Sequence, residues 1–170
     1  EFKNKKYKIV GNIPYYITGY LLRVIGESKS KPQICVFTIQ NEVADRINAK
    51  PPHMNLLAAS VQIWADTKII SRVPRGAFSP PPKVQSAVIK LTTKTMGIPK
   101  SDLLNYYKFL HTIFKQPRKT ILNNLVSGLN KNREELVSGL IQLNLDPIIR
   151  PQNLKIEEII KLFELFYKND

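Results

Sequence analysis

Hydrophobic positions follow two different spacings in the first part of the chain. Runs of β-branched and aromatic residues at 7–10 and 33–40 are typical of buried strands, and the apolar positions within 18–27 have helical spacing. The order strand, helix, strand predicts one parallel crossover unit of an α/β sheet. Helices are expected next at 41–49 and 55–66.

Two further strands are expected at 68–73 and 84–92, joined by a loop with consecutive prolines at 80–82. Prolines lack the backbone N–H that a sheet ladder needs, so this loop cannot continue either strand. The two strands therefore fit the edge of an α/β sheet. Trp64, on the preceding apolar helix, is expected to lie in the core.

After residue 99 the pattern becomes wholly helical. Four helices are expected, at 101–114, 118–129, 133–143 and 155–167. Ser101 is expected to cap the first of them, because a serine side chain can accept a hydrogen bond from the first turn. The sequence thus predicts an α/β domain over 1–96 and a small all-α domain of four helices over 99–170.

The composition narrows the functional classes. No apolar run reaches the roughly 18 residues that a membrane span needs, and the first residues lack the apolar core of a signal peptide. The two histidines, His53 and His111, and the lone Cys35 have no spacing suited to zinc, so no metal is expected. Cys35 is interpreted as a small buried side chain in a reducing cytoplasm rather than a catalytic thiol.

The charge favours a polyanionic partner. The chain carries +13, and residues 1–98 hold 15 basic against 5 acidic residues. The segment 67–94 has six basic residues, Lys83 among them, and no acid. A lysine-rich composition that decorates solvated faces would give the same counts. A membrane-surface role is a weaker alternative, because the basic residues do not line one face of a long helix.

The segment Asn12-Ile13-Pro14-Tyr15 follows a predicted strand, where an α/β sheet presents its carboxyl edge to ligands. An Asn oxygen and a backbone carbonyl fixed by proline can accept the two hydrogens of an adenine amino group, and an aromatic ring can stack on the base. The alternative interpretation is an ordinary strand-to-helix turn, which often contains the same residue types.

Further segments in the same order extend this observation into a family resemblance. Residues 12–18 resemble the Asn-(Ile/Leu)-Pro-Tyr motif of the rRNA adenine dimethyltransferase family. Residues 40–46 resemble its Gln-x-Glu-x-x-x-Arg segment, 73–88 its Phe-x-Pro-x-Pro-x-Val segment, and 114–121 its Phe-x-Gln-x-Arg-Lys-Thr-Ile segment. The resemblance spans about 7–166, and the last two segments favour the bacterial KsgA type over the antibiotic-resistance methylases of large-subunit rRNA.

The resemblance implies roles for individual residues. Asn12 would accept from the target amino group beside the methyl of S-adenosylmethionine (SAM), and Pro14 would offer its carbonyl. Tyr15 and Phe78 would enclose the flipped adenine, although Phe78 also fits a core aromatic of the loop. RNA phosphates would be met by four basic residues, whose alternative interpretation is a solvated surface: Lys83, Lys115, Arg118 and Lys119.

Two parts of the family pattern are not found. The family binds SAM through a Gly-x-Gly-x-Gly loop and an acidic residue, whereas the seven glycines here are never two apart. We therefore expect a truncated Rossmann-like methyltransferase domain, a fragment that would be inactive alone. Pro117 stands where the family commonly has Arg, which is expected to start the second helix of the all-α domain at Arg118.

The resemblance implies SAM-dependent dimethylation of two adjacent adenines near the 3′ end of small-subunit rRNA. The expected partner is the immature small ribosomal subunit, and the protein is expected to be monomeric and cytoplasmic. Two alternatives remain open. One is a non-catalytic RNA-binding or ribosome-assembly module, which the basic surface supports equally. The other is a DNA adenine methyltransferase, against which the helical domain argues.

Overall fold

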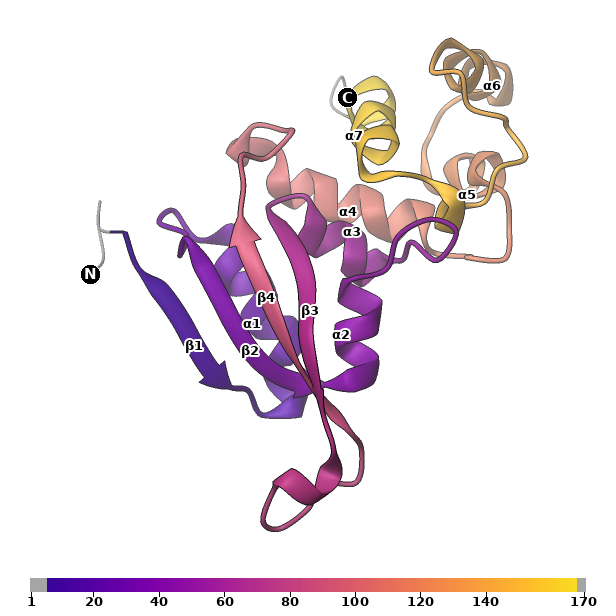
Figure 1. Cartoon of the computed structure of the whole chain (residues 1–170). Coiled ribbons are helices and arrows are strands. Elements are labelled where there is room, and N and C mark those ends of the chain that lie inside the picture. The colour runs from indigo at the N-terminus through magenta and orange to yellow at the C-terminus, as the bar shows by residue number, and fades with distance from the viewer. Residues whose placement is uncertain (1–5, 168–170) are drawn as a thin grey trace. The chain divides into compact units, whose positions relative to one another are not determined.

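The computed structural model describes residues 6–167 of the chain. These residues form two compact units. One unit comprises the described residues up to 48 together with 61–95 and contains the sheet; the other comprises 49–60 and the described residues from 96 onward and is helical (Figure 1). Each unit has its own buried side chains. Residues 49–60 belong by their contacts to the helical unit, although they precede two strands of the sheet in sequence.

The sheet has four strands in the order β1, β2, β4, β3. Their bounds are Lys8–Asn12 for β1, Ile34–Gln40 for β2, Ala65–Val73 for β3 and Ser86–Thr93 for β4. β1 and β2 are parallel, joined through α1 (Thr18–Glu27), and β4 runs antiparallel to both of its neighbours. This confirms the α/β class and the parallel crossover expected from the sequence.

Helices α1 and α2 (Asn41–Ile47) lie on one face of the sheet (Figure 1). Alternate residues of the two central strands point to that face and are at most 1% exposed: Cys35, Phe37 and Ile39 on β2, and Ala87, Ile89 and Leu91 on β4. The residues between them on these strands are partly exposed, whereas Ser86, at the start of β4, is buried. This period of two is what a strand with one covered face requires.

β1 was expected to be a buried strand, and this expectation is wrong. Val10, in its middle, is 78% exposed. Val10 pairs with Val36 of β2, on the sheet face away from α1, and β1 has β2 as its sole strand neighbour among residues 6–167. The apolar run correctly predicts a strand. Whether the side chains of that strand are buried depends on what packs against the sheet face they point to.

The boundary between the third helix and β3 also differs from the expectation. α3 is short, Leu56–Gln62, and β3 begins at Ala65 rather than at Lys68. The backbone N–H of Trp64 donates to Val61, and Trp64 accepts from Lys94, so the chain turns from helix to strand there. Ile63, Trp64 and Ala65 are all buried, so their hydrophobic pattern is compatible with a helix and with a strand. The core position expected for Trp64 is confirmed.

The helical unit contains four longer helices and packs around an aromatic centre. Their bounds are Leu103–Ile113 for α4, Ile121–Gly128 for α5, Arg133–Gln142 for α6 and Ile156–Phe166 for α7. The rings of Tyr106 and Phe163 meet edge to face with centroids 5.5 Å apart, and Phe109 packs on Phe163 at 5.8 Å. Segment 49–60 joins this unit through Met54, whose N–H donates to the carbonyl of Gln152.

Two helix starts differ from the expectation. Ser101 caps no helix: it lies in a 3₁₀ turn, Lys100–Asp102, and its hydroxyl bonds Asp102 Oδ1. α5 begins at Ile121 rather than Arg118, because Thr120 is the N-cap and its Oγ1 accepts from the N–H of Asn123 at 3.2 Å. An N-cap threonine satisfies a donor that the first turn leaves free.

Within the described part of the chain, none of the helices combines the length and the apolar character needed to cross a bilayer.

The structure predicts that Cys35 is chemically inert in the folded protein. Burial raises the pKa of its thiol to about 11, and the side chain is 1% exposed. At pH 8 about one thiol in a thousand would be ionised, and the thiolate is the reactive form. We expect no reaction with Ellman's reagent over an hour at pH 8, and one equivalent after unfolding in guanidinium. Rapid labelling of folded protein would contradict the buried position.

Candidate active site and RNA-contact residues

A cavity of about 290 Å³ opens at the carboxyl end of β1 in the α/β unit. Its lining comes from two stretches of chain more than 60 residues apart: Asn12, Ile13, Pro14 and Tyr15 on one side, and Phe78, Pro80 and Pro82 on the other. The structure thus brings Asn12, Pro14, Tyr15 and Phe78, which the sequence singled out, around one cavity. Its lining consists of one amide side chain, two aromatic side chains, an isoleucine and three prolines, and includes no charged side chain.

The first side of the cavity is set by the β1–β2 ladder. The N–H of Ile13 donates to the carbonyl of Thr38 at 3.0 Å, so the pairing continues one residue beyond the strand. Asn12 is thereby held at the rim with its side chain exposed. The chain then tightens into a 3₁₀ turn, Tyr15–Ile17, in which the Pro14 carbonyl accepts from Ile17 at 3.1 Å. A carbonyl oxygen has a second lone pair, which this bond leaves available.

Tyr15 is fixed by a residue that the sequence analysis did not identify. Its phenol oxygen lies 2.7 Å from Oγ of Ser86, across 71 residues of sequence. Ser86 is fully buried at the start of β4, where it pairs with Gln40 and Val73. A hydroxyl at the first position of an apolar strand is the signal that could have indicated this role, because a buried hydroxyl needs a partner.

Phe78 is held by a turn of the β3–β4 hairpin. A 3₁₀ turn at Arg75–Ala77 precedes it, and its N–H donates to the carbonyl of Arg75 at 3.2 Å. The guanidinium of Arg75 in turn donates to the carbonyl of Lys83 at 3.3 Å, which closes the loop. Phe78 is half-buried, so one part of its ring remains available at the cavity.

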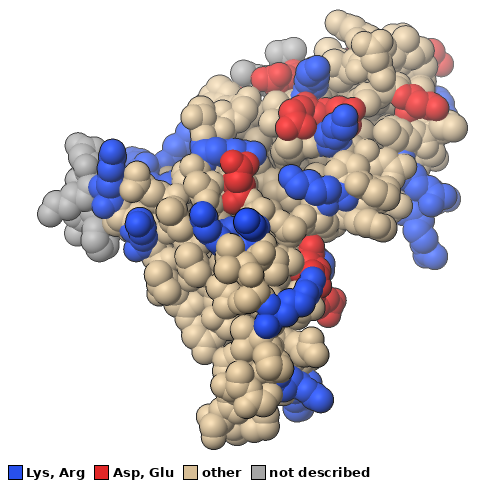
Figure 2. Space-filling model, in the orientation of Figure 1, with Lys and Arg blue, Asp and Glu red and all other residues tan. Residues whose placement is uncertain are grey.

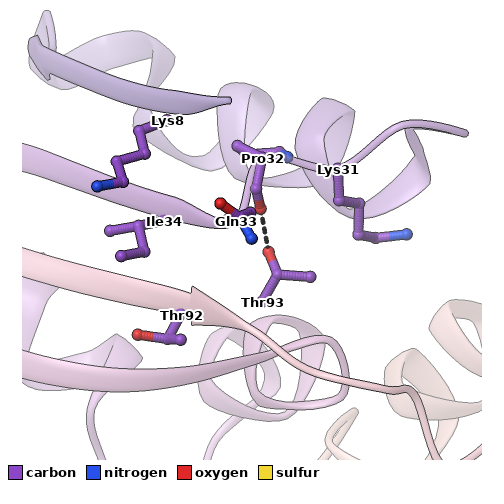
Figure 3. A pocket seen from close by; sticks show the side chains of 7 residues that line it. All are labelled: Lys8, Lys31, Pro32, Gln33, Ile34, Thr92 and Thr93. Atoms are coloured by element: carbon purple, nitrogen blue, oxygen red, sulfur yellow. Dashed lines mark hydrogen bonds between the residues drawn. The ribbon is translucent and has the colours of Figure 1, made fainter. Parts of the chain in front are cut away.

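A larger hollow, of about 490 Å³, lies at the opposite ends of the same strands. It is lined by Lys8, Lys31, Pro32, Gln33, Ile34, Thr92 and Thr93 (Figure 3). Thr93 donates to the carbonyl of Pro32, and the ammonium groups of Lys8 and Lys31 point away from each other. Because its polar groups do not converge on a common point, we place the candidate site at the smaller cavity.

Several basic residues of the α/β unit already have partners. Arg72 forms an ion pair with Asp45 at 2.8 Å, and its hydrogen bond lowers the pKa of that carboxyl. Lys94 pairs with Asp66 at 3.0 Å. Lys83 is exposed and forms no ion pair with a described residue. The acid-free run at 67–94 is therefore partly neutralised by acids that lie outside it or at its edge.

In the helical unit, three of the predicted RNA-contact residues share one exposed turn. Lys115, Gln116, Pro117, Arg118 and Lys119 line a hollow of about 330 Å³, and all five are exposed. None of the three cations forms an ion pair within residues 6–167. Elsewhere, basic side chains form several separate groups on the face shown in Figure 2. This turn is therefore a concentrated, unpaired positive charge within its unit.

Among residues 6–167, no group of three or more His, Cys, Asp or Glu side chains is arranged to hold a metal ion.

Comparison with known proteins places these features in a family. Residues 1–168 match the family model described as ribosomal RNA adenine dimethylase. A ribosomal RNA small subunit methyltransferase A from Dehalococcoides mccartyi is 40% identical over 94% of this chain and 55% of its own length. The protein of that name from Mesomycoplasma hyopneumoniae is 35% identical over 99% of this chain and 65% of its own length. The chain thus spans a little more than half the length of these curated relatives.

Solved structures agree at the level of the fold. A dimethyladenosine transferase from Plasmodium falciparum superposes with a TM-score of 0.74 at 24% identity, over 93% of this chain and 66% of that one. The 23S rRNA methyltransferase ErmE gives 0.70 at 20% identity, over 98% and 69%. The α/β unit therefore has the Rossmann-like methyltransferase architecture expected from the sequence. On the match over residues 1–168, the chain belongs to the ribosomal RNA adenine dimethylase family.

Proposed function

We propose that this chain is the target-adenine and RNA-binding part of a SAM-dependent methyltransferase that dimethylates two adjacent adenines near the 3′ end of small-subunit rRNA. The observation that carries the proposal is the cavity lined by Asn12, Pro14, Tyr15 and Phe78. The names of the curated relatives support the substrate class.

The cavity offers the acceptors that an adenine amino group needs. That nitrogen is a poor nucleophile, because its lone pair is delocalised into the ring. Asn12 Oδ1 would accept one of its hydrogens and the free lone pair of the Pro14 carbonyl the other, which draws the nitrogen toward tetrahedral geometry. The turn bond from Ile17 already fixes the direction of the Pro14 carbonyl, so little reorganisation would be needed.

Two aromatic rings would hold the base. Tyr15 and Phe78 come from different sides of the cavity, and each stacked aromatic contributes about 1 to 3 kcal/mol per base. Taking a base out of its stack costs a few kcal/mol, so two rings can offset it. The bond to Ser86 holds the Tyr15 ring in one orientation before the base arrives.

The methyl group would come from SAM. When bound, this cofactor supplies an activated methyl on a positively charged sulfur. The residues present fit its methyl end, because the exposed Asn12 amide lines the cavity and forms no hydrogen bond with another described residue. The chain has no glycines two apart, so its residues do not supply a Gly-x-Gly-x-Gly loop. Asn12 would position the adenine amino nitrogen for methylation. The methylated nitrogen would then lose its proton to water, so no general base is required.

RNA would be held by phosphate contacts from basic residues that do not line the cavity. Lys115, Arg118 and Lys119 form the unpaired basic turn of the helical unit, and Lys83 lies on the hairpin loop that carries Phe78. Phosphate contacts position a nucleic acid, whereas the cavity selects the base. We further propose that the substrate is the immature small ribosomal subunit and that the protein acts as a cytoplasmic monomer.

Asn12→Ala in the whole protein that contains this chain should abolish methyl transfer while leaving RNA affinity nearly unchanged. Loss of one acceptor that acts in the transition state costs about 3 to 4 kcal/mol, roughly 100- to 1,000-fold in rate. Single-turnover transfer from labelled SAM to undermethylated small subunits measures it. A variant that kept more than about a tenth of the wild-type rate, a loss under about 1.4 kcal/mol, would make the motif a structural turn and favour a non-catalytic assembly module.

Tyr15→Ala and Tyr15→Phe should separate stacking from positioning. The alanine variant loses the ring, and we expect a KM raised about 5- to 150-fold, the equivalent of 1 to 3 kcal/mol. The phenylalanine variant keeps the ring but leaves the Ser86 hydroxyl buried without its partner. It should lower the free energy of unfolding by about 1 to 3 kcal/mol with a smaller change in KM. Equal KM values for the two variants would exclude stacking by Tyr15.

The 170-residue chain should bind a small-subunit rRNA hairpin in a salt-dependent manner. Each phosphate contact contributes about 0.7 to 0.9 to the slope of log affinity against log salt. Combined replacement of Lys115, Arg118 and Lys119 by Ala should therefore reduce the slope by about 2 to 3. Fluorescence anisotropy between about 50 and 200 mM salt measures both quantities. An unchanged slope in this triple variant would remove the turn from the RNA interface.

A further inference from the structure

Asn124 is a buried polar residue in the helical unit that the proposed activity does not use. It lies in the first half of α5 and is 1% exposed, between the buried Ile121, Leu122 and Leu125. Burying an amide among apolar side chains is costly unless all its groups are hydrogen-bonded. Its partners therefore indicate what the residue does.

All the hydrogen bonds of the Asn124 side chain go to the backbone around the basic turn. Its Oδ1 accepts from the N–H of Gln116 at 2.9 Å. Its Nδ2 donates to the carbonyls of Gln116 at 3.1 Å and Thr120 at 3.0 Å. One buried amide thus ties together the two ends of the segment that carries Lys115, Arg118 and Lys119.

The rest of the turn reinforces this closure. The N–H of Lys119 donates to the carbonyl of Gln116 at 2.9 Å, and Pro117 restricts both its own φ and the conformation of Gln116. Two of the first three backbone donors of α5 are also taken, Ile121 by the carbonyl of Ile149 at 2.7 Å and Asn123 by the side chain of Thr120. An anion at the turn would therefore contact mainly the three cationic side chains. The backbone that carries them is held by the Asn124 amide.

We propose that Asn124 is a positioning residue for RNA binding: its buried amide holds the 115–119 turn in one conformation, so that Lys115, Arg118 and Lys119 face the phosphates of RNA together. The inference rests on the proposed RNA contact of this turn and adds the residue that sets its geometry. Without the amide, the turn would sample many conformations and would have to be ordered on binding, at a cost in affinity.

The test compares Asn124→Ala with the matched control Asn123→Ala in the 170-residue chain. Asn123 is the exposed neighbour on α5, and its hydrogen bond to the turn is made by its backbone. In Asn124→Ala we expect fast hydrogen exchange at the Gln116 amide with far-UV circular dichroism retained. Affinity for the fluorescent rRNA hairpin should fall, and the salt slope should become shallower by about 0.7 to 0.9 for each phosphate that the turn no longer binds. Asn123→Ala should match wild type in Gln116 amide exchange, hairpin affinity and salt slope.

Pro117→Gly provides a second route, because it loosens the same turn without touching the core or the charges. It should also weaken hairpin binding, so the proposal can be tested even if Asn124→Ala does not fold. Normal affinity and slope in folded Asn124→Ala whose Gln116 amide exchanges rapidly, or in Pro117→Gly, would overturn the positioning role. Wild-type binding by the Lys115, Arg118 and Lys119 triple variant would instead overturn the RNA contact itself.

Discussion

The pairing of β2 with its two neighbours is the constraint on which the candidate site depends. β1 runs parallel to β2, which puts Asn12 at the carboxyl end of both strands, beside Thr38. β4 runs antiparallel to β2, so its first residue, Ser86, lies opposite Gln40 at that same edge. Two segments more than 60 residues apart therefore meet there. This meeting allows the Tyr15–Ser86 hydrogen bond. Tyr15 comes shortly after the end of β1, and Ser86 is the first residue of β4.

The sequence was sufficient to predict most of the elements, because strand and helix patterns are local signals, and the family resemblance indicated the residues that line the cavity. The β-branched runs predicted the strands, and the motif after the first strand predicted where Asn12 and Tyr15 would lie. The sequence was insufficient where burial or an element boundary depends on tertiary packing. Val10 has a strand-forming side chain but is exposed, because no described helix covers that face of β1. Ile63 to Ala65 satisfy helix and strand periods alike, and the pairing of Ala65 with Thr93 decides between them.

The 115–119 segment illustrates the same limit at the level of function. Its charges can be read from the sequence, and the resemblance singled out Lys115, Arg118 and Lys119. The following helix was expected to begin at Arg118, because proline favours the first turn of a helix. In the structure, Thr120 competes successfully as N-cap, and the residues before it are drawn into a turn by the Asn124 amide. The closure of the turn has no local sequence signal, because the amide that holds it comes from within the next helix.

Two of the buried polar side chains hold segments that carry a proposed function. Among the described residues, Thr18, Gln62, Ser86 and Asn124 are the buried ones with polar side chains. Gln62 donates to the carbonyl at the end of α2, which is a structural role, and Thr18 Oγ1 has no hydrogen-bond partner within residues 6–167. Ser86 and Asn124 differ from them, because each holds an exposed or half-buried segment that carries a proposed function. An apolar residue could fill either position, but it could not fix the orientation of a tyrosine ring or of a basic turn. We infer that these two polar groups have a geometric role, one in each unit of the chain.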